Sequence, residues 1–155
     1  MSYLTQKTIN QDVIFSGIAL HSGHNVNVCI KPAEPNFGIV FKRVDIKANN
    51  LVYPNFMNVT NTSLNTTVEN EFGVKVSTIE HLMGALFGLG IDNALIEIDN
   101  EEVPILDGSA KIFIEKIISA GFNVSTAPIK IIKVNKEITF SDGERYISIK
   151  PSTLS

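Results

Sequence analysis

The sequence predicts an α+β fold: a two-layer sandwich of a mostly antiparallel sheet and two helices, followed by the first strands of a second, similar domain. Three observations predict this class. The first third of the chain alternates apolar and polar residues, the middle carries two helical stripes, and strand patterns return after Pro128. We therefore expect residues 1–125 to form the first α+β domain and residues 126–155 the incomplete start of a second one.

The first third of the chain has the pattern of β-strands. Between Asn25 and Lys31 three branched apolar residues alternate with polar ones, which is typical of a strand with one buried face. The segment before it, His21–His24, has the composition of a turn. We expect strands at Val13–Phe15, Asn25–Lys31, Gly38–Phe41 and Thr62–Val68.

Two helices are predicted in the middle of the chain, because apolar residues recur there at helical spacing. The first begins near Ser77, ends at Gly88 or Gly90, and has a stripe formed by Ile79, Leu82, Met83 and Leu86. The second follows Asp107-Gly108-Ser109, ends at Gly121, and has a stripe formed by Ala110, Phe113, Ile114 and Ile117. A buried strand at Asn93–Asp99 is expected between them.

The last part of the chain returns to strands, at Ile129–Val134, Glu137–Phe140 and Tyr146–Ile149. The segment Ile147–Ser152 also echoes Val28–Ala33, since each is a strand that ends in Lys-Pro. This similarity indicates either a duplicated domain or a chance match. If it is a duplication, the second domain has only begun, and its strands have no helix to cover them.

Composition excludes several classes of protein. The 155 residues include 13 Lys and Arg against 16 Asp and Glu, which leaves no basic footprint for nucleic acid or an anionic membrane surface. No window is long and apolar enough for a transmembrane segment. The single cysteine, Cys29, excludes a disulfide within the chain. The N-terminal sequence Met1–Lys7 lacks the pattern of a signal peptide, so we expect a cytoplasmic protein.

The strongest candidate site is the pair Glu80 and His81 at the start of the first helix. At 100° per residue, both lie away from the apolar stripe, and the small residues Gly84 and Ala85 lie beside them. Two structural interpretations remain open: Ser77 and Glu80 fit a capping box, and His81 is then an exposed helix residue. As a zinc motif the helix is incomplete, because it offers a single ligand.

Two other groups of residues allow a functional interpretation. His21 and His24 lie on a predicted turn and either complete a metal site with His81 or are solvated. Asp107 precedes the second helix, where it either binds an anion or acts as an N-cap, and we favour the cap.

Four motifs, taken together, resemble the UDP-3-O-acyl-N-acetylglucosamine deacetylases, the zinc amidases of lipid A biosynthesis. They are Gly17–Gly23, Thr78–Leu86, Gly88–Asn93 and Pro104–Ala110, and the similarity extends in register from about Thr5 to Ser155. The resemblance implies two α+β domains of one topology that face each other across the active site. It also implies hydrolysis of UDP-3-O-(3-hydroxyacyl)-N-acetylglucosamine with release of acetate.

The resemblance also implies roles for individual residues. His81 matches the zinc ligand of the first domain, and Glu80 matches the general base that takes a proton from the attacking water. Leu64, Asn65 and Thr66 match a segment that lines the substrate cleft, although the family often has Cys where Asn65 stands. His21 matches a histidine near the cleft.

The family's other functional groups lie beyond the matched segment. The second domain of the family carries the other two zinc ligands, which are a histidine and an aspartate. It also carries the catalytic lysine, the histidine that acts as general acid, and the insert that holds the acyl chain. We therefore expect this chain to be the N-terminal half of such an enzyme, inactive without the missing C-terminal domain. The alternative is a non-catalytic binding module that docks a partner through the Glu80/His81 face.

Overall fold

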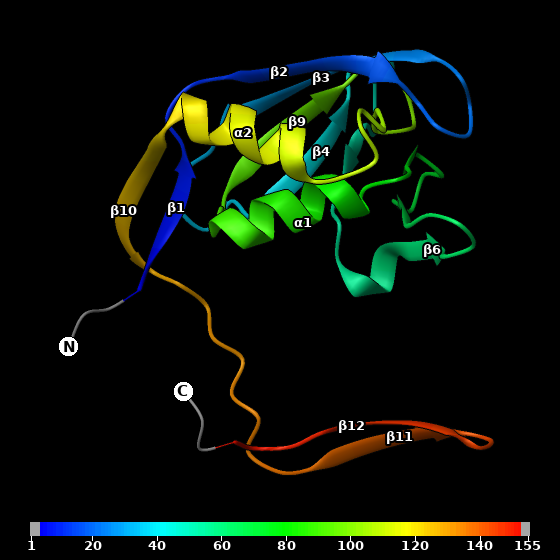
Figure 1. The fold of residues 1–155 in the computed structure, drawn as a ribbon, viewed down its shortest axis with the longest axis vertical. Helices are drawn as coiled ribbons and strands as arrows, with labels where there is room; N and C mark the ends of the chain where they lie inside the picture. Colours follow the sequence, from blue (N-terminus) through cyan, green and yellow to red (C-terminus); the bar gives the residue numbers. More distant parts are fainter. Residues whose placement is uncertain (1–3, 153–155) are drawn as a thin grey trace.

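A five-stranded sheet and two helices form the body of the computed structural model, which describes residues 4–152. The strands occur in the order β2 (Val13–Ile18), β3 (Asn25–Pro32), β9 (Ala94–Ile98), β4 (Ile39–Arg43) and β5 (Leu51–Val52). All neighbours are antiparallel except β4 and β9. The helices α1 (Glu80–Leu89) and α2 (Lys111–Ala120) cover one face of this sheet (Figure 1).

The core lies between the sheet and the helices. In β3, Val26, Val28 and Ile30 are buried while the residues between them are exposed or half-buried, as the alternation predicted. The rings of Phe15 in β2 and Phe113 in α2 meet with their centroids 4.9 Å apart. The α+β class and the two-layer arrangement are thus confirmed.

Both helices end at the predicted glycines, and α2 follows Ser109 as predicted, but α1 begins later than expected. Gly90 ends α1 in the left-handed conformation, with φ 67°, and its N–H bonds back to the last turn. Gly121 follows α2. The start of α1 is Glu80 rather than Ser77, because Thr78 has a φ of 55° and cannot belong to a right-handed helix.

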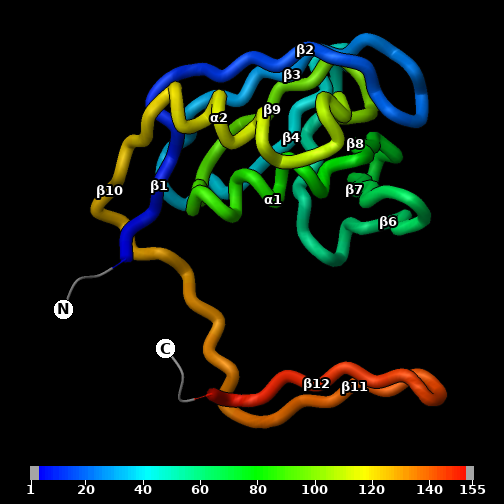
Figure 2. Tube along the Cα trace, viewed as in Figure 1, coloured from blue at the N-terminus to red at the C-terminus, as the bar shows by residue number. Residues whose placement is uncertain are grey.

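A two-stranded ribbon joins distant parts of the chain. The strand β1 (Thr5–Ile9) pairs antiparallel with β10 (Phe122–Pro128), as Figure 2 shows. The sequence did not indicate β10, because its residues lack a regular alternation. The expected domain boundary at residue 125 falls inside this strand, and the division into two domains stays a prediction.

A small sheet lies beside the start of α1. It contains β6 (Val59–Asn61), β7 (Thr67–Glu69) and β8 (Lys75–Val76), and the short 3-10 helix η1 (Phe56–Asn58) precedes it. The strand expected at Thr62–Val68 is wrong over most of its length. The chain turns there, because the Asn61 side chain accepts the N–H of Ser63 and Leu64 adopts a φ of 65°.

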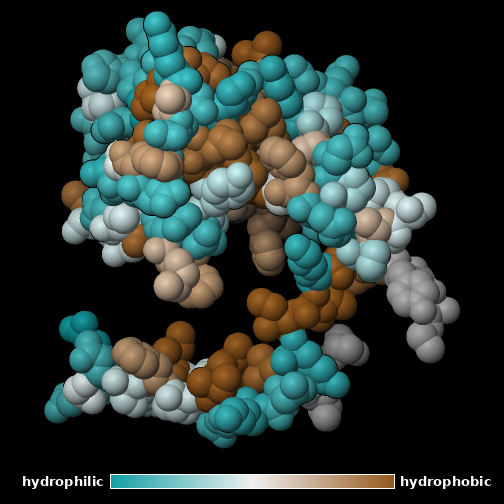
Figure 3. Space-filling model, turned by 180° about the vertical axis from the view of Figure 1, so that it is seen from behind, coloured by the Kyte–Doolittle hydropathy of each residue, from teal (hydrophilic) through white to brown (hydrophobic). Residues whose placement is uncertain are grey.

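The C-terminal strands form a hairpin rather than the expected meander. The strands β11 (Ile138–Asp142) and β12 (Arg145–Ile149) pair with each other, whereas Ile129–Val134 contains no strand. Their register places four exposed apolar residues on one face: Ile138, Phe140, Ile147 and Ile149. Figure 3 shows brown, hydrophobic atoms along this hairpin. Residues 1–3 and 153–155, at the ends of the two expected domains, lie outside the described part. Among residues 4–152 there is no helix that could span a membrane.

The packing of the core indicates how shortening a side chain of α2 affects stability. Replacing Phe113, which is fully buried, by Ala is expected to lower the free energy of unfolding by about 3 to 5 kcal/mol, because it leaves a cavity against Phe15. Ile118→Ala on the exposed side of the same helix is the control, with an expected change within about 0.5 kcal/mol. Urea unfolding followed by circular dichroism measures both, and equal losses would contradict the packing described.

Candidate active site

The first turn of α1 is joined to the turn that precedes β7. The Oε2 atom of Glu80 accepts the N–H of Thr66 at 3.0 Å, and the N–H of Ile79 donates to the carbonyl of Thr66 at 3.4 Å. Both backbone groups of Thr66 are therefore bound at the helix start. The structure thus brings together Glu80 and the Leu64–Thr66 segment, which lie far apart in the sequence.

The carboxylate of Glu80 does not belong to a capping box, so that interpretation is wrong. The N-cap position of α1 is Ile79, and no side chain caps the helix. Ser77 instead donates its N–H and its hydroxyl to the carbonyl of Glu101, at 2.7 and 3.3 Å. Within residues 4–152, the Oε1 atom of Glu80 has no hydrogen-bond partner. One oxygen of this carboxylate is anchored and the other is available.

His81 lies on the open side of α1. It is half-buried and makes no hydrogen bond or ion pair to any residue in the described range 4–152. Gly84 and Gly88 lie beside it on the helix surface, and Phe87 of the same helix is 88% exposed. Ala85, which was expected on this face, is fully buried, since it packs in the core. Both ring nitrogens of His81 are therefore free to bind a ligand.

The loop after β2 is held by a buried carboxylate. Glu102 is only 2% exposed and accepts the backbone N–H groups of His21 and Ser22, at 3.0 and 2.9 Å. The Nδ1 atom of His21 lies 2.8 Å from Oε1 of the same carboxylate. These bonds fix both the loop and the imidazole ring of His21.

Thr78 connects this loop to the start of α1. Its hydroxyl donates to Oε1 of Glu102 at 2.9 Å, and its side chain is buried. A φ of 55° is strained for a β-branched residue, and such backbone persists only where the surroundings enforce it. Here the hydrogen bond to Glu102 directs the threonine inward one residue before the N-cap of the helix.

The environment of Glu102 determines its pKa. Burial raises the pKa of this carboxyl, but the hydrogen bonds from His21, Ser22 and Thr78 outweigh burial and hold the pKa at about 2, below the ordinary 4.5. Glu102 is therefore a carboxylate at neutral pH and acts only as an acceptor.

The three histidines are not arranged as a metal site, so of the two alternatives for His21 and His24 the shared site with His81 is wrong. His21 is bound to Glu102, while His81 lies on the open side of α1. In the part of the chain that the structure describes, no group of three or more His, Cys, Asp or Glu residues is arranged to hold a metal ion. His24, on the same loop as His21, is exposed.

A polar cavity of about 520 Å³ adjoins His21. Asn65 also faces it, and its amide oxygen accepts the hydroxyl of Thr67 at 3.0 Å. Of the other predicted site residues, Leu64 is 90% exposed, and neither Glu80 nor His81 lines this space. The predicted residues thus occupy two adjacent places: the cavity beside His21 and the open face of α1.

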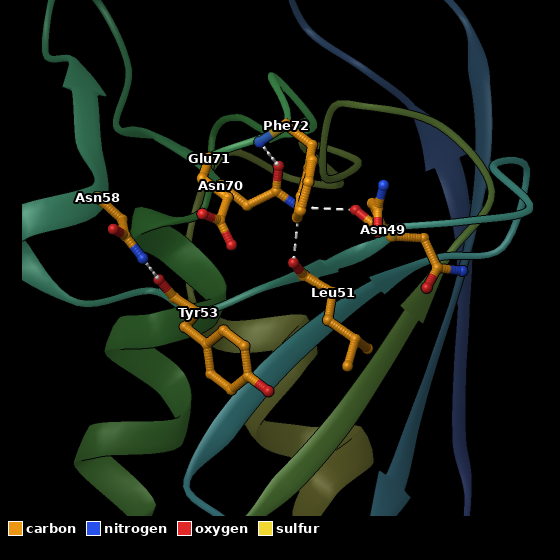
Figure 4. A pocket seen from close by; sticks show the side chains of 8 residues that line it. Asn49, Leu51, Tyr53, Asn58, Asn70, Glu71 and Phe72 are labelled. Carbon is orange, nitrogen blue, oxygen red and sulfur yellow. Dashed lines mark hydrogen bonds between the residues drawn. The ribbon is translucent and has the colours of Figure 1, made fainter.

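A second cavity, of about 530 Å³, lies away from these residues (Figure 4). The Asn70 amide donates to the carbonyls of Asn49 and Leu51, and the Asn58 amide donates to the carbonyl of Tyr53. These amides are thus used to hold the loops in place. None of the predicted site residues lines this cavity.

Asp107 has a local role at the approach to α2. It accepts the N–H and the hydroxyl of Ser109, at 3.1 and 3.0 Å, and these bonds lower the pKa of its carboxyl. The hydroxyl of Ser109 in turn accepts the N–H of Lys111 at 3.1 Å. Because α2 begins at Lys111, the expected N-cap role of Asp107 is wrong, and the residue shapes the turn instead.

Comparison with known proteins identifies the family. Residues 6–155 match the UDP-3-O-acyl N-acetylglycosamine deacetylase family. The chain belongs to this family. It is 44% identical over 148 residues to the UDP-3-O-acyl-N-acetylglucosamine deacetylase of Cellvibrio japonicus, a match that covers 96% of this chain and 48% of that protein. It is 46% identical over 147 residues to the enzyme of the same name from Citrifermentans bemidjiense, covering 95% of this chain and 48% of that one.

These matches cover only part of each relative, and this limits what they show about the predicted site residues. The chain spans about half the length of the curated relatives that it matches. The relatives' names support a deacetylase, while the roles of Glu80, His81, Leu64, Asn65, Thr66 and His21 stay predictions.

The role of Glu102 in holding His21, Ser22 and Thr78 is not visible in the sequence. Its partners His21 and Thr78 are 81 and 24 positions away, so no local pattern connects them. The only available signal was an acidic residue between the buried strand β9 and the buried Val103, a place where a charge needs partners.

The lowered pKa of Glu102 indicates how the free energy of unfolding depends on pH. Its pKa is about 2 in the folded chain against an ordinary 4.5, so its stabilising effect is present above pH 4.5 and is lost as the pH falls toward 2. The shift corresponds to about 3 kcal/mol. Glu102→Gln is expected to unfold more easily at neutral pH and to lose less stability on acidification than the wild-type chain.

The measurement is urea unfolding at pH values of about 7 and about 3. The exposed neighbour Glu101 provides the control, since Glu101→Gln is expected to follow the wild-type pH dependence. If Glu102→Gln and Glu101→Gln behave alike, the buried carboxylate does not stabilise the fold.

Proposed function

We propose that this chain supplies the general base and one zinc ligand of a deacetylase that acts on UDP-3-O-(3-hydroxyacyl)-N-acetylglucosamine, with release of acetate in lipid A biosynthesis. The observation that carries this proposal is the first turn of α1. There Glu80 has one anchored and one free oxygen, and the adjacent His81 has two free ring nitrogens. Membership of the deacetylase family supports the reaction class.

His81 fits zinc as a single ligand. A neutral imidazole is among the commonest zinc ligands, and this ring is half-buried on a rigid helix without a competing partner in residues 4–152. A catalytic zinc site takes about three protein ligands, so we infer that a histidine and an aspartate of the second domain complete it. Bound zinc supplies a Lewis acid that polarises the amide carbonyl.

Glu80 acts as the general base. The Thr66 N–H binds Oε2, so Oε1 is the atom that takes the proton from the attacking water and passes it toward the leaving amine. Successive helix residues diverge by about 100°, so His81 would hold the metal while the carboxylate of Glu80 would remain free for proton transfer beside it. The Leu64–Thr66 turn lies against Glu80, and we propose that it borders the substrate.

An exposed aromatic residue favours an additional or alternative role for the same surface. Phe87, two turns after Glu80 on the same face of α1, is 88% exposed. Leu64, in the turn that is bound to Glu80 through Thr66, is likewise 90% exposed, and exposed apolar groups that gather in one region mark protein interfaces. The second candidate function is therefore a non-catalytic module that docks a partner through the Glu80/His81 face, the partner being a separately made second domain.

Substitutions at the helix start separate these two functions. In a protein that contains both halves, Glu80→Gln is expected to reduce kcat by about 100- to 10,000-fold with zinc content unchanged, because only the base is lost. His81→Ala is expected to lose zinc and activity together. The control is His24→Ala, on an exposed loop, with full activity and zinc. Full activity of the Glu80→Gln protein would contradict the general-base role, and loss of the complex between separately made halves in the same variant would support the docking module instead.

The isolated chain provides a second test. We expect the 155-residue chain to show no turnover of the UDP-linked substrate, because one ligand does not make a catalytic zinc site. Addition of the second domain is expected to restore activity in a stoichiometric complex. Clear turnover by a preparation of the chain free of longer protein would contradict the proposal, and acetate release is the measurement.

A further inference from the structure

The imidazole of His21 is held in one state by a carboxylate that the proposed reaction does not use. We propose that Glu102 is a positioning residue: it fixes the proton of His21 on Nδ1 and leaves Nε2 to accept a hydrogen bond from a hydroxyl or amide N–H of a ligand in the adjoining cavity. The identity of that ligand as the deacetylase substrate rests on the proposed function, whereas the state of the ring does not.

The hydrogen bonds around Glu102 leave one assignment for the His21 proton. The carboxylate is ionised at neutral pH and can only accept, and its Oε1 lies 2.8 Å from Nδ1. With the proton on Nε2, a lone pair of Nδ1 would face the carboxylate oxygen across that distance, and the two acceptors would repel each other. The proton therefore lies on Nδ1.

Thr78 cannot supply the missing proton. Its hydroxyl has a single hydrogen, which is donated to Oε1 of Glu102 at 2.9 Å, while its oxygen lies 3.5 Å from Nδ1 of His21. The backbone N–H groups of His21 and Ser22 also point at the carboxylate. All four donors thus converge on Glu102, and His21 can neither turn away nor change its tautomer without losing one of them.

The other ring nitrogen of His21 has no partner among residues 4–152. His21 lines the space of about 520 Å³, and its side chain is 36% exposed. The remaining lining is polar throughout and includes the ion pair between Lys75 and Glu69, at 3.6 Å. Its hydroxyl and amide groups belong to Ser22, Thr60, Asn61, Asn65, Thr67 and Ser77. Such a lining suits a polar ligand rather than an acyl chain.

The tautomer can be measured directly on the 155-residue chain without any ligand. Long-range ¹H–¹⁵N correlation spectra of histidine-labelled protein, recorded at a pH of about 8.5, distinguish the two neutral tautomers. We expect a protonated Nδ1 and an unprotonated Nε2 for His21, and the opposite or a mixed state for exposed His24. A proton on Nε2 of His21, alone or together with one on Nδ1, overturns the proposal.

Variants test whether Glu102 is the cause. Glu102→Leu removes the acceptor of Nδ1–H and releases the Thr78 hydroxyl, 3.5 Å from Nδ1, to donate to the ring, so we expect the His21 proton to move to Nε2. Glu102→Asp keeps the carboxylate and is expected to keep the wild-type tautomer, as is the control Glu101→Gln. If Glu102→Leu does not fold, the wild-type and Glu102→Asp spectra still decide, since loss of Nδ1–H in either contradicts the assignment. An unchanged tautomer in folded Glu102→Leu also overturns it.

The acceptor role has a separate readout in a protein that contains both halves, with the UDP-linked acylated glucosamine as the probe. Glu102→Leu is expected to raise KM by about 3- to 10-fold, the loss of one hydrogen bond, with a much smaller effect on kcat than Glu80→Gln. Unchanged KM in a variant with a switched tautomer contradicts the acceptor role. Absence of turnover in the wild-type protein would refute the proposed function and leave the tautomer result standing.

Discussion

The buried carboxylate of Glu102 is the constraint on which the site geometry depends. An isolated carboxylate in the interior costs several kcal/mol, so its four hydrogen-bond donors must be held in place. Two of these donors come from His21, one from Ser22 and one from Thr78. The strained backbone of Thr78 then delays the start of α1 until Glu80, whose carboxylate is thereby left for Thr66. One interior charge thus fixes the cavity loop and the helix start together.

The sequence allowed the two-layer architecture to be predicted, because β3, β9 and the helical stripes have a regular period that a single buried face imposes. It misplaced what depends on distant partners. The strand β10 exists because β1 is available to pair with it, and the turn at Leu64 is set by a left-handed residue and an Asn side chain. The pair Glu80 and His81 was recognisable from its helical position. The role of Glu102 was not, since its partners are remote in the sequence.

The arrangement on α1 is open, which is consistent with a site completed from outside the described residues. Glu80 keeps one free oxygen, His81 has no partner within residues 4–152, and Phe87 lies exposed near them. The hairpin β11–β12 presents a further apolar face, and the chain spans about half the length of its relatives. A second domain that covers these surfaces would remove water from the proposed reaction centre and strengthen the electrostatic interactions there.

Zinc binding tests this account most directly. Isothermal titration of the chain with zinc, alone and together with the second domain, measures whether His81 is one ligand of a shared site. The account predicts weak or undetectable binding by the chain alone. It predicts one tightly bound zinc per complex, with affinity reduced by at least about 100-fold in His81→Ala, since one of about three protein ligands is lost. Tight stoichiometric binding by the isolated chain, or an unchanged affinity of the His81→Ala complex, would contradict it.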